Sequence, residues 1–135
     1  MITEPSSRRI IARQIEWMKT SKSRAIGMLK FDQPPQNFGA IFKLPLFGFF
    51  PLVHTIGMKF PIDILFCDSQ KKVLHRYEKV KPGRFIFPML HAVGGCSYLL
   101  EFSNCDISNI RKGVQLEWPE ENPKEKTEEK SGESA

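Results

Sequence analysis

Alternation of apolar and polar residues predicts that this chain consists mainly of short β-strands. The clearest example is the segment 61–67, in which successive side chains point to opposite faces of an extended strand. Ile62, Ile64 and Phe66 fall on one face, and Asp63, Leu65 and Cys67 fall on the other. A polar run at 68–71 reads as a turn, and residues 72–80 alternate again, so the pattern predicts a β-hairpin.

Further strand-like segments lie on both sides of this hairpin. They occupy residues 39–46, 49–55, 84–88, 97–102 and 113–118. A Pro-Gly pair after Lys81 predicts a type II turn before the third of these segments. Short strands separated by turn signals at intervals of eight to twelve residues are typical of a sandwich or barrel. We therefore expect a mainly β, small single-domain fold that resembles a sandwich or barrel.

The first third of the chain has a less regular pattern. Residues 1–9 are mostly polar and are expected to form a flexible N-terminus, and residues 10–20 fit either a strand or a short helix. Hydroxyl side chains at 20–23 can cap the free N–H groups of a helix, which predicts one short helix over 24–29. The Pro34-Pro35 pair predicts a loop.

The C-terminal segment 119–135 differs in composition from the rest. It is rich in charge and has no aromatic or aliphatic residue except Ala135, so it cannot bury enough apolar surface to offset its ordering entropy. We expect residues 10–118 to form the domain and residues 119–135 to form a disordered acidic and lysine-rich tail. The tail holds six Glu and three Lys, a charge of −3, which leaves +8 for residues 1–118 out of a total of +5.

The composition is that of a soluble globular protein. Hydrophobic residues make up 41% of the chain and include eleven Phe, enough for a real core. The most apolar stretch, 44–53, has ten residues, too few to cross a bilayer, which takes about 20. The N-terminal segment has no apolar core of signal-peptide length, so we expect a cytoplasmic protein without a transmembrane segment.

The cysteine and histidine residues predict neither a metal site nor a cofactor. Three Cys stand at 67, 96 and 105, an odd number whose spacing fits no zinc motif, and the three His are far apart. Asp68 follows Cys67, and its negative charge would raise the pKa of that thiol, which argues against a thiolate nucleophile.

A mixed motif in the middle of the chain indicates a family. The run from Val53 to Ile64, VHTIGMKFPIDI, resembles the signature of the family catalogued as domain of unknown function 192. Thr20, Arg24 and the Gly-Met-Leu run that starts at Gly27 are similar to the T-x-x-x-R-x-x-G-L pattern of this family. The segments 73–74, 81–84, 99–102 and 110–113 follow in the family's order.

The resemblance implies a compact, mainly β, sandwich-like fold with one short helix, and it implies no established chemistry. Relatives often carry an export signal, whereas this N-terminus fits a cytoplasmic relative. Two positions depart from the family pattern, because Cys105 stands where Gly is usual and Val114 stands where Asp is common.

Several residues of the motif are candidates for a polar binding pocket. His54 could act as a base or bind an anion, or it could be a hydrogen-bonded structural residue. Asp63 interrupts an apolar strand and therefore needs a partner, for which Arg24 and Arg84 are the candidates. Met58, close to His54 in the sequence, and Glu101, inside the apolar run YLLEF, complete the set.

The leading hypothesis is a small binding or interaction module for an unknown small polar ligand or a protein partner. The rival from another class is an enzyme of hydrolase or nuclease type, in which Asp63 and Glu101 would form an acid pair with separated pKa values.

A third hypothesis is a nucleic-acid-associated protein. The predicted hairpin carries basic residues that could meet phosphates, namely Lys71, Lys72, Arg76, Lys79 and Lys81. The alternative is that these side chains only prevent edge-to-edge strand pairing. The acidic tail could fold back on this patch as an internal competitor, in which case deletion of 119–135 would tighten binding to polyanions.

Overall fold

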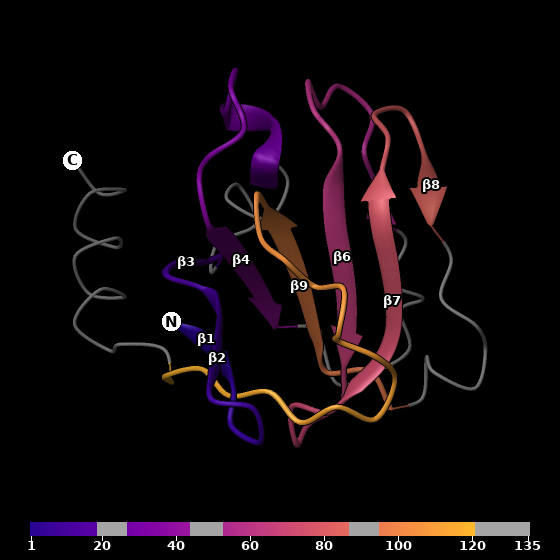
Figure 1. The fold of residues 1–135 in the computed structure, drawn as a ribbon. Coiled ribbons are helices and arrows are strands. Elements are labelled where there is room, and N and C mark those ends of the chain that lie inside the picture. The colour runs from indigo at the N-terminus through magenta and orange to yellow at the C-terminus, as the bar shows by residue number, and fades with distance from the viewer. Residues whose placement is uncertain (19–26, 44–52, 87–94, 121–135) are drawn as a thin grey trace, which may run out of the picture.

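The structure, a computed structural model, describes residues 1–18, 27–43, 53–86 and 95–120, and it is mainly β (Figure 1). The strands are β1 (Ile2–Glu4), β2 (Arg9–Ala12), β3 (Gln14–Trp17), β4 (Phe38–Lys43), β5 (Val53–His54), β6 (Ile62–Cys67), β7 (Val73–Val80), β8 (Phe85–Ile86) and β9 (Tyr98–Ser103). A single 3₁₀ turn, η1 (Gly27–Lys30), is the helical element of the described residues. None of the helical structure described is long and apolar enough to cross a membrane.

Five strands form one open sheet in the order β3-β4-β9-β6-β7. The β3–β4 pair is parallel and the other pairs are antiparallel. The hairpin predicted for 61–80 is confirmed as β6 and β7, and the predicted strand 97–102 is confirmed as β9 in the middle of the sheet. Two small ribbons, β1-β2 and β5-β8, accompany this sheet.

Each face of the five-stranded sheet is covered by its own apolar layer. On one side Leu65, Leu100 and Phe102 pack against residues from β1, β2 and the segment 107–118, and we call this side the terminal face. On the other side Ile64, Phe66 and Leu99 pack against Met28, Met58, Phe60 and Ile86, and we call this side the signature face. The sandwich-like expectation is therefore met by layers on both faces of an open sheet.

Three expectations from the sequence need correction. The short helix predicted over 24–29 is replaced in the described part by η1, which spans only four residues, and residues 24–26 lie outside the described ranges. The segment 1–9, expected to be flexible, contains β1, and Ile2 is completely buried. The segment 113–118 forms isolated bridges instead of a strand, because Gln115 pairs with Lys72 and Glu117 pairs with Thr3 on a different element.

The predicted strands 39–46, 49–55 and 84–88 correspond to β4, β5 and β8, although Thr55 and Arg84 are described and lie just outside β5 and β8. Their remaining residues, 44–46, 49–52 and 87–88, lie outside the described ranges, as does the tail from residue 121.

Candidate functional site

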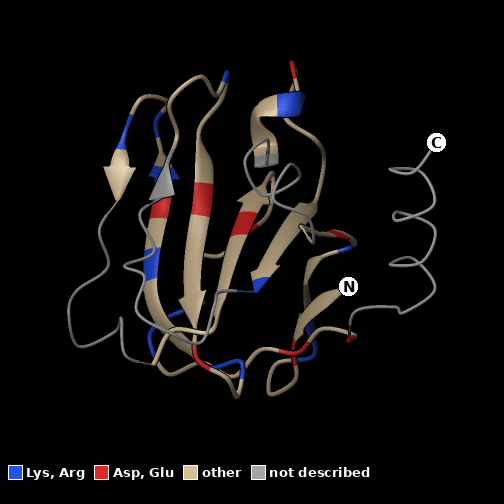
Figure 2. Cartoon of the chain, turned by 180° about the vertical axis from the view of Figure 1, so that it is seen from behind, with Lys and Arg blue, Asp and Glu red and all other residues tan. Residues whose placement is uncertain are grey.

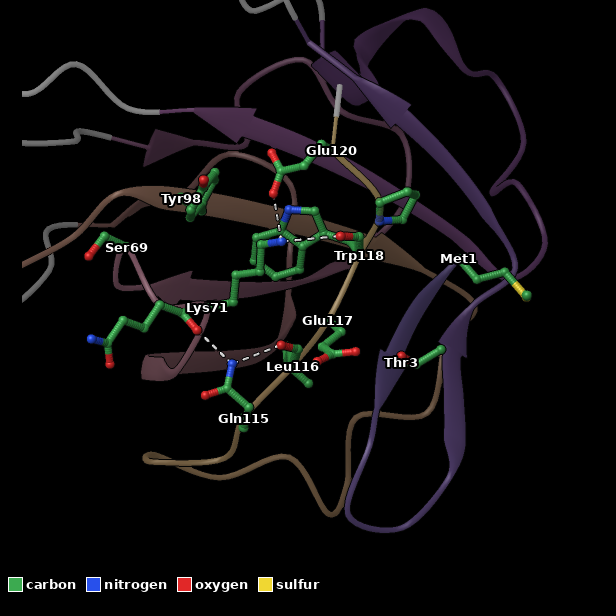
Figure 3. A pocket seen from close by; sticks show the side chains of 12 residues that line it. Met1, Thr3, Ser69, Lys71, Tyr98, Gln115, Leu116, Glu117, Trp118 and Glu120 are labelled. Carbon is green, nitrogen blue, oxygen red and sulfur yellow. Dashed lines mark hydrogen bonds and ion pairs between the residues drawn. The ribbon is translucent and has the colours of Figure 1, made fainter. Parts of the chain in front are cut away.

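An open groove of about 760 Å³ lies where β1, the turn between β6 and β7, and the segment 115–120 come together (Figure 3). Its lining combines polar, charged and aromatic side chains, with Met1, Thr3, Ser69, Gln70, Lys71, Tyr98, Gln115, Leu116, Glu117, Trp118, Pro119 and Glu120 around it. This volume falls in the range of about 300–1,000 Å³ that is typical of small-molecule sites.

The turn between β6 and β7 presents the central side chain of the groove. The Asp68 carboxylate accepts hydrogen bonds from the backbone N–H groups of Gln70 and Lys72, both at 2.9 Å, which closes the turn. Lys71 adopts a left-handed φ of 67° inside this turn. Such a conformation is uncommon for a residue with a side chain, so the turn holds Lys71 at some backbone cost.

Backbone hydrogen bonds fasten the C-terminal segment to the other walls. Leu116 N–H donates to Lys71 O at 3.0 Å, and Thr3 and Glu117 exchange two hydrogen bonds of 2.8 and 2.9 Å. The Gln115 side-chain amide donates to Gln70 O at 2.6 Å and to Leu116 O at 2.9 Å. The walls are thus joined to one another, and the groove is formed before any ligand arrives.

Aromatic rings form the inner wall of the groove. Trp118 is only 5% exposed, and its ring meets Tyr98 edge to face at a centroid distance of 5.0 Å. Trp17, which does not line the groove, also meets Tyr98 edge to face, at a centroid distance of 6.5 Å. The indole N–H of Trp118 is buried and has no acceptor among the described residues.

The Lys71 ammonium group lies against this wall. It stands 5.1 Å from the centroid of the Trp118 ring, within reach of a cation–π attraction. It donates to Trp118 O at 3.2 Å and to the Glu120 carboxylate at 3.0 Å (Figure 3). The Lys71 side chain is 19% exposed, whereas the Glu120 side chain is 78% exposed. The groove therefore holds a partly desolvated cation whose anionic partner sits mostly in solvent.

The family-like motif, in contrast, organises a turn. The buried Thr55 hydroxyl donates to Lys81 O at 2.7 Å and accepts from Arg84 N–H at 2.9 Å, so it bridges the two ends of the predicted turn. Gly83 has the positive φ of 82° that a type II turn requires at its third position. A second turn follows in the motif itself, where Met58 N–H donates to Thr55 O at 3.2 Å and Gly57 has a φ of 85°.

Four of the candidate residues belong to or flank this motif, namely His54, Arg84, Met58 and Arg24. The backbone of His54 pairs with Phe85 in the β5-β8 ribbon, while its side chain lies outside what is described, as does Arg24. Arg84 is exposed and contributes its backbone to the Thr55 network. Met58 is buried in the layer on the signature face.

Asp63 stabilises an irregularity of the sheet. Its carboxylate accepts the backbone N–H of Lys79 at 2.7 Å, at the register shift of the β6–β7 pair where Lys79 has a φ of 50°. Burial raises the pKa of Asp63, and the hydrogen bond from Lys79 opposes that rise. Among the described residues no arginine forms an ion pair with Asp63, so the pair expected with Arg84 is not formed.

Glu101 on β9 lies on the strand next to that of Asp63, β6. Figure 2 shows acidic positions in red on neighbouring strands of the sheet. Asp63 alternates with Ile62 and Ile64, so it shares the terminal face with Leu65, whereas Glu101 shares the signature face with Leu99. The two carboxyl groups therefore point to opposite sides of the sheet and do not form an acid pair. Burial raises the pKa of Glu101 to about 7.

The basic residues of the hairpin are used in several ways. Lys71 enters the groove, and the Arg76 guanidinium pairs with Glu78 at 2.6 Å. The backbone N–H of Lys72 is held by Asp68, and the backbone of Lys79 forms the bulge beside Asp63. Lys81 contributes its carbonyl to Thr55.

The thiol groups are not activated as nucleophiles. Burial raises the pKa of Cys67 far above its ordinary value, and it raises the pKa of Cys96 to about 11 and that of Cys105 to about 12. Within the described ranges, no three His, Cys, Asp or Glu residues gather into a group that could hold a metal ion.

Comparison with known proteins assigns the family. The family model of domain of unknown function 192, described as "Uncharacterized ACR", matches residues 2–118. The chain belongs to this family. The match begins within β1, so the domain of unknown function 192 includes the first residues that the sequence pattern had left outside it.

Two solved structures share the fold of this domain of unknown function 192 protein. One is a protein of unknown function from Novosphingobium aromaticivorans, with a TM-score of 0.70 and 21% identity over 87% of this chain and 81% of that one. The other is described as a candidate transcription regulator from Sinorhizobium meliloti, with a TM-score of 0.61 and 20% identity over 76% and 79% of the two chains. No curated protein matches the sequence. At these identities the likeness shows the fold alone.

The sequence interpretation missed most of the groove. Of its lining residues only Lys71 was a candidate, as part of a basic patch. Trp118 and Glu120 lie 47 and 49 residues after Lys71, so no local motif connects them. The available signal was the contrast in charge between the tail and the hairpin. Of the tail, residues 119 and 120 are described, and Glu120 pairs with Lys71 of this hairpin.

Proposed function

We propose that the chain is a small binding module and that its ligand occupies the groove between the β6–β7 turn and the segment 115–120. The observation that carries this proposal is the Lys71 ammonium group, which is held against the Trp118 ring inside a groove of about 760 Å³. Ligand sites commonly combine aromatic walls with a few convergent polar groups, and this groove has both.

The hydrogen bonds between the walls support the same proposal. The lining residues come from β1, the β6–β7 turn, β9 and the C-terminal segment, and direct backbone bonds link three of these four elements. A groove that is already organised spends less binding free energy on ordering its own side chains.

The test is a thermal-shift screen of the full chain against small acids, amines, nucleotides, sugars and short oligonucleotides. A ligand that binds the folded state raises its stability by about 2.7 kcal/mol at one hundred times the dissociation constant. We expect a hit that stabilises the wild type and is lost in Ser69→Trp, because Ser69 is exposed at the groove and a large side chain there fills it.

The matched control is Ser108→Trp, which adds the same side chain at an exposed serine that does not line the groove. Equal stabilisation of wild type and both variants would place the ligand elsewhere and contradict the proposal. A hit confined to oligonucleotides and lost when Lys72, Lys79 and Lys81 are neutralised would favour the nucleic-acid hypothesis instead.

A further inference from the structure

We infer that the ligand of the groove carries a carboxylate that binds Lys71, and that Glu120 of the acidic tail is its built-in competitor. This inference rests on the proposed function, since it names the ligand class for the same groove. It adds that a carboxylate is the group recognised and that Lys71 is the residue that binds it. It also adds that Glu120 occupies the space beside the Lys71 ammonium, here called the anion position.

The surroundings of Lys71 create the anion position. One N–H donor of the ammonium goes to Trp118 O and another goes to Glu120, while the Trp118 ring covers one side. A cation that has lost much of its water is stabilised by an anion close by, and the Glu120 carboxylate now supplies that anion. The anion position therefore already accepts a carboxylate, from within the chain.

Glu120 is suited to be displaced. Its side chain is 78% exposed, and an ion pair with so exposed a partner contributes little to stability. It follows Pro119 directly and stands two residues after Trp118, so its side chain can turn away from Lys71 without displacing the buried ring. A carboxylate on a ligand that also contacts the groove walls would gain contacts that Glu120 does not make.

The lining favours a carboxylate over a phosphate group. A phosphate commonly takes several charged donors or a cluster of backbone N–H groups, whereas Lys71 is the one basic side chain among the lining residues. The Gln115 amide is occupied by two backbone carbonyl groups. Glu117 also lines the groove, and its negative charge disfavours a dianion more than a monoanion.

The decisive variant is Glu120→Gln, which keeps the side-chain shape and removes the charge. If the internal pair contributes up to about 1 kcal/mol, its loss tightens binding of an external carboxylate by about twofold to fivefold. We would titrate the full chain with benzoate at low ionic strength and follow the backbone amides of 69–71 and 115–118 by NMR. Lys71→Gln should abolish the benzoate response of these amides.

The chain offers a matched control on another surface. Lys30 also pairs with a glutamate, Glu16, at 2.6 Å and also lies over an aromatic ring, that of Phe31, at 5.2 Å. Glu16→Gln changes the net charge as Glu120→Gln does but frees a lysine that does not line the groove. It should leave the affinity for benzoate unchanged.

Each outcome decides the matter. Unchanged affinity in Glu120→Gln, or an equal gain in Glu16→Gln, would overturn the inference, as would inorganic phosphate binding more tightly than benzoate. A ligand from the screen that is lost in Ser69→Trp but insensitive to Lys71 and Glu120 would leave the groove as a binding site and reject only its carboxylate chemistry.

Discussion

Glu101 is a carboxyl side chain in the middle strand of the sheet, buried in an apolar layer. It is 7% exposed, and its neighbours across the sheet are Ala40 and Ile64. Burial disfavours the charged form and raises its pKa from the ordinary 4.5 to about 7. At pH values between 4.5 and about 7, Glu101 is therefore mostly protonated in the folded state and mostly ionised in the unfolded state.

The sign of the resulting pH dependence follows from proton binding. Between pH 4.5 and about 7 the folded state binds more protons at Glu101 than the unfolded state, so its contribution lowers the free energy of unfolding as pH rises. The loss amounts to about 3 kcal/mol and is complete above the folded pKa. Glu101→Gln resembles the protonated side chain and should remove this loss.

Urea unfolding of both proteins at pH 5 and pH 8 measures this effect. We expect the variant to gain about 2.5 kcal/mol relative to the wild type between these two values, because part of the loss has already occurred at pH 5. If the free energy of unfolding changed by the same amount in both proteins between pH 5 and pH 8, Glu101 would have the same pKa in the folded and unfolded states.

At this scale the sequence predicts that a residue needs a partner but not which partner it finds. The apolar pattern around Asp63 correctly indicates a carboxylate in need of compensation, and arginine was the expected source. The observed partner is the backbone N–H of Lys79, which becomes available only because β7 bulges at this point. A bulge depends on the pairing of two strands, so a pattern in one strand does not reveal it.

At the scale of elements, Thr55 is the link between the β5-β8 ribbon and the turn that follows β7. Its hydroxyl takes the place of a direct hydrogen bond between Lys81 O and Arg84 N–H. In the part of the chain that the structure describes, the ribbon pairs two residues of each strand, and this side-chain bridge joins it to the turn. The family motif at this point thus has a structural role in the described part of the chain.

Thr55→Val removes the hydroxyl with little change in volume. We expect a loss of about 2 kcal/mol in the free energy of unfolding, because the carbonyl of Lys81 and the N–H of Arg84 lose their partner together. Thr55→Ser retains the hydroxyl and should recover most of this loss. Chemical unfolding of the three proteins measures it, and equal destabilisation by Val and Ser would instead assign the role to the methyl group.

The strands that the sequence predicts well are segments of six to eight residues with a clear periodicity or a continuous apolar run. β6 and β7 follow from side chains that point to the two faces in turn, whereas β9 follows from the apolar run YLLEF. The segment 113–118 has a similar composition, yet its hydrogen bonds go to Val73, Lys71 and Thr3 in succession. Propensity alone does not separate a strand in a ladder from a segment that bridges several partners.

At the scale of the whole molecule, the groove exists because distant segments converge on Lys71. β1 begins the chain, Tyr98 opens β9, and Trp118 follows the last bridge to β1. The fold class was predictable from local periodicity, whereas this convergence depends on the order of strands in the sheet. The proposed groove is built around the β6–β7 turn and the segment 115–120, whereas the family motif covers β5 and the start of β6.

The most direct test of the proposed groove uses the two tryptophan residues of the chain. Trp118 lines the groove and Trp17 does not, so the two indole N–H signals in an NMR spectrum provide a probe and an internal reference. We predict that a ligand from the screen shifts the Trp118 signal in a saturable manner, with a much smaller change at Trp17. A stabilising ligand that leaves the Trp118 signal in place would contradict the assignment of this groove as the binding site.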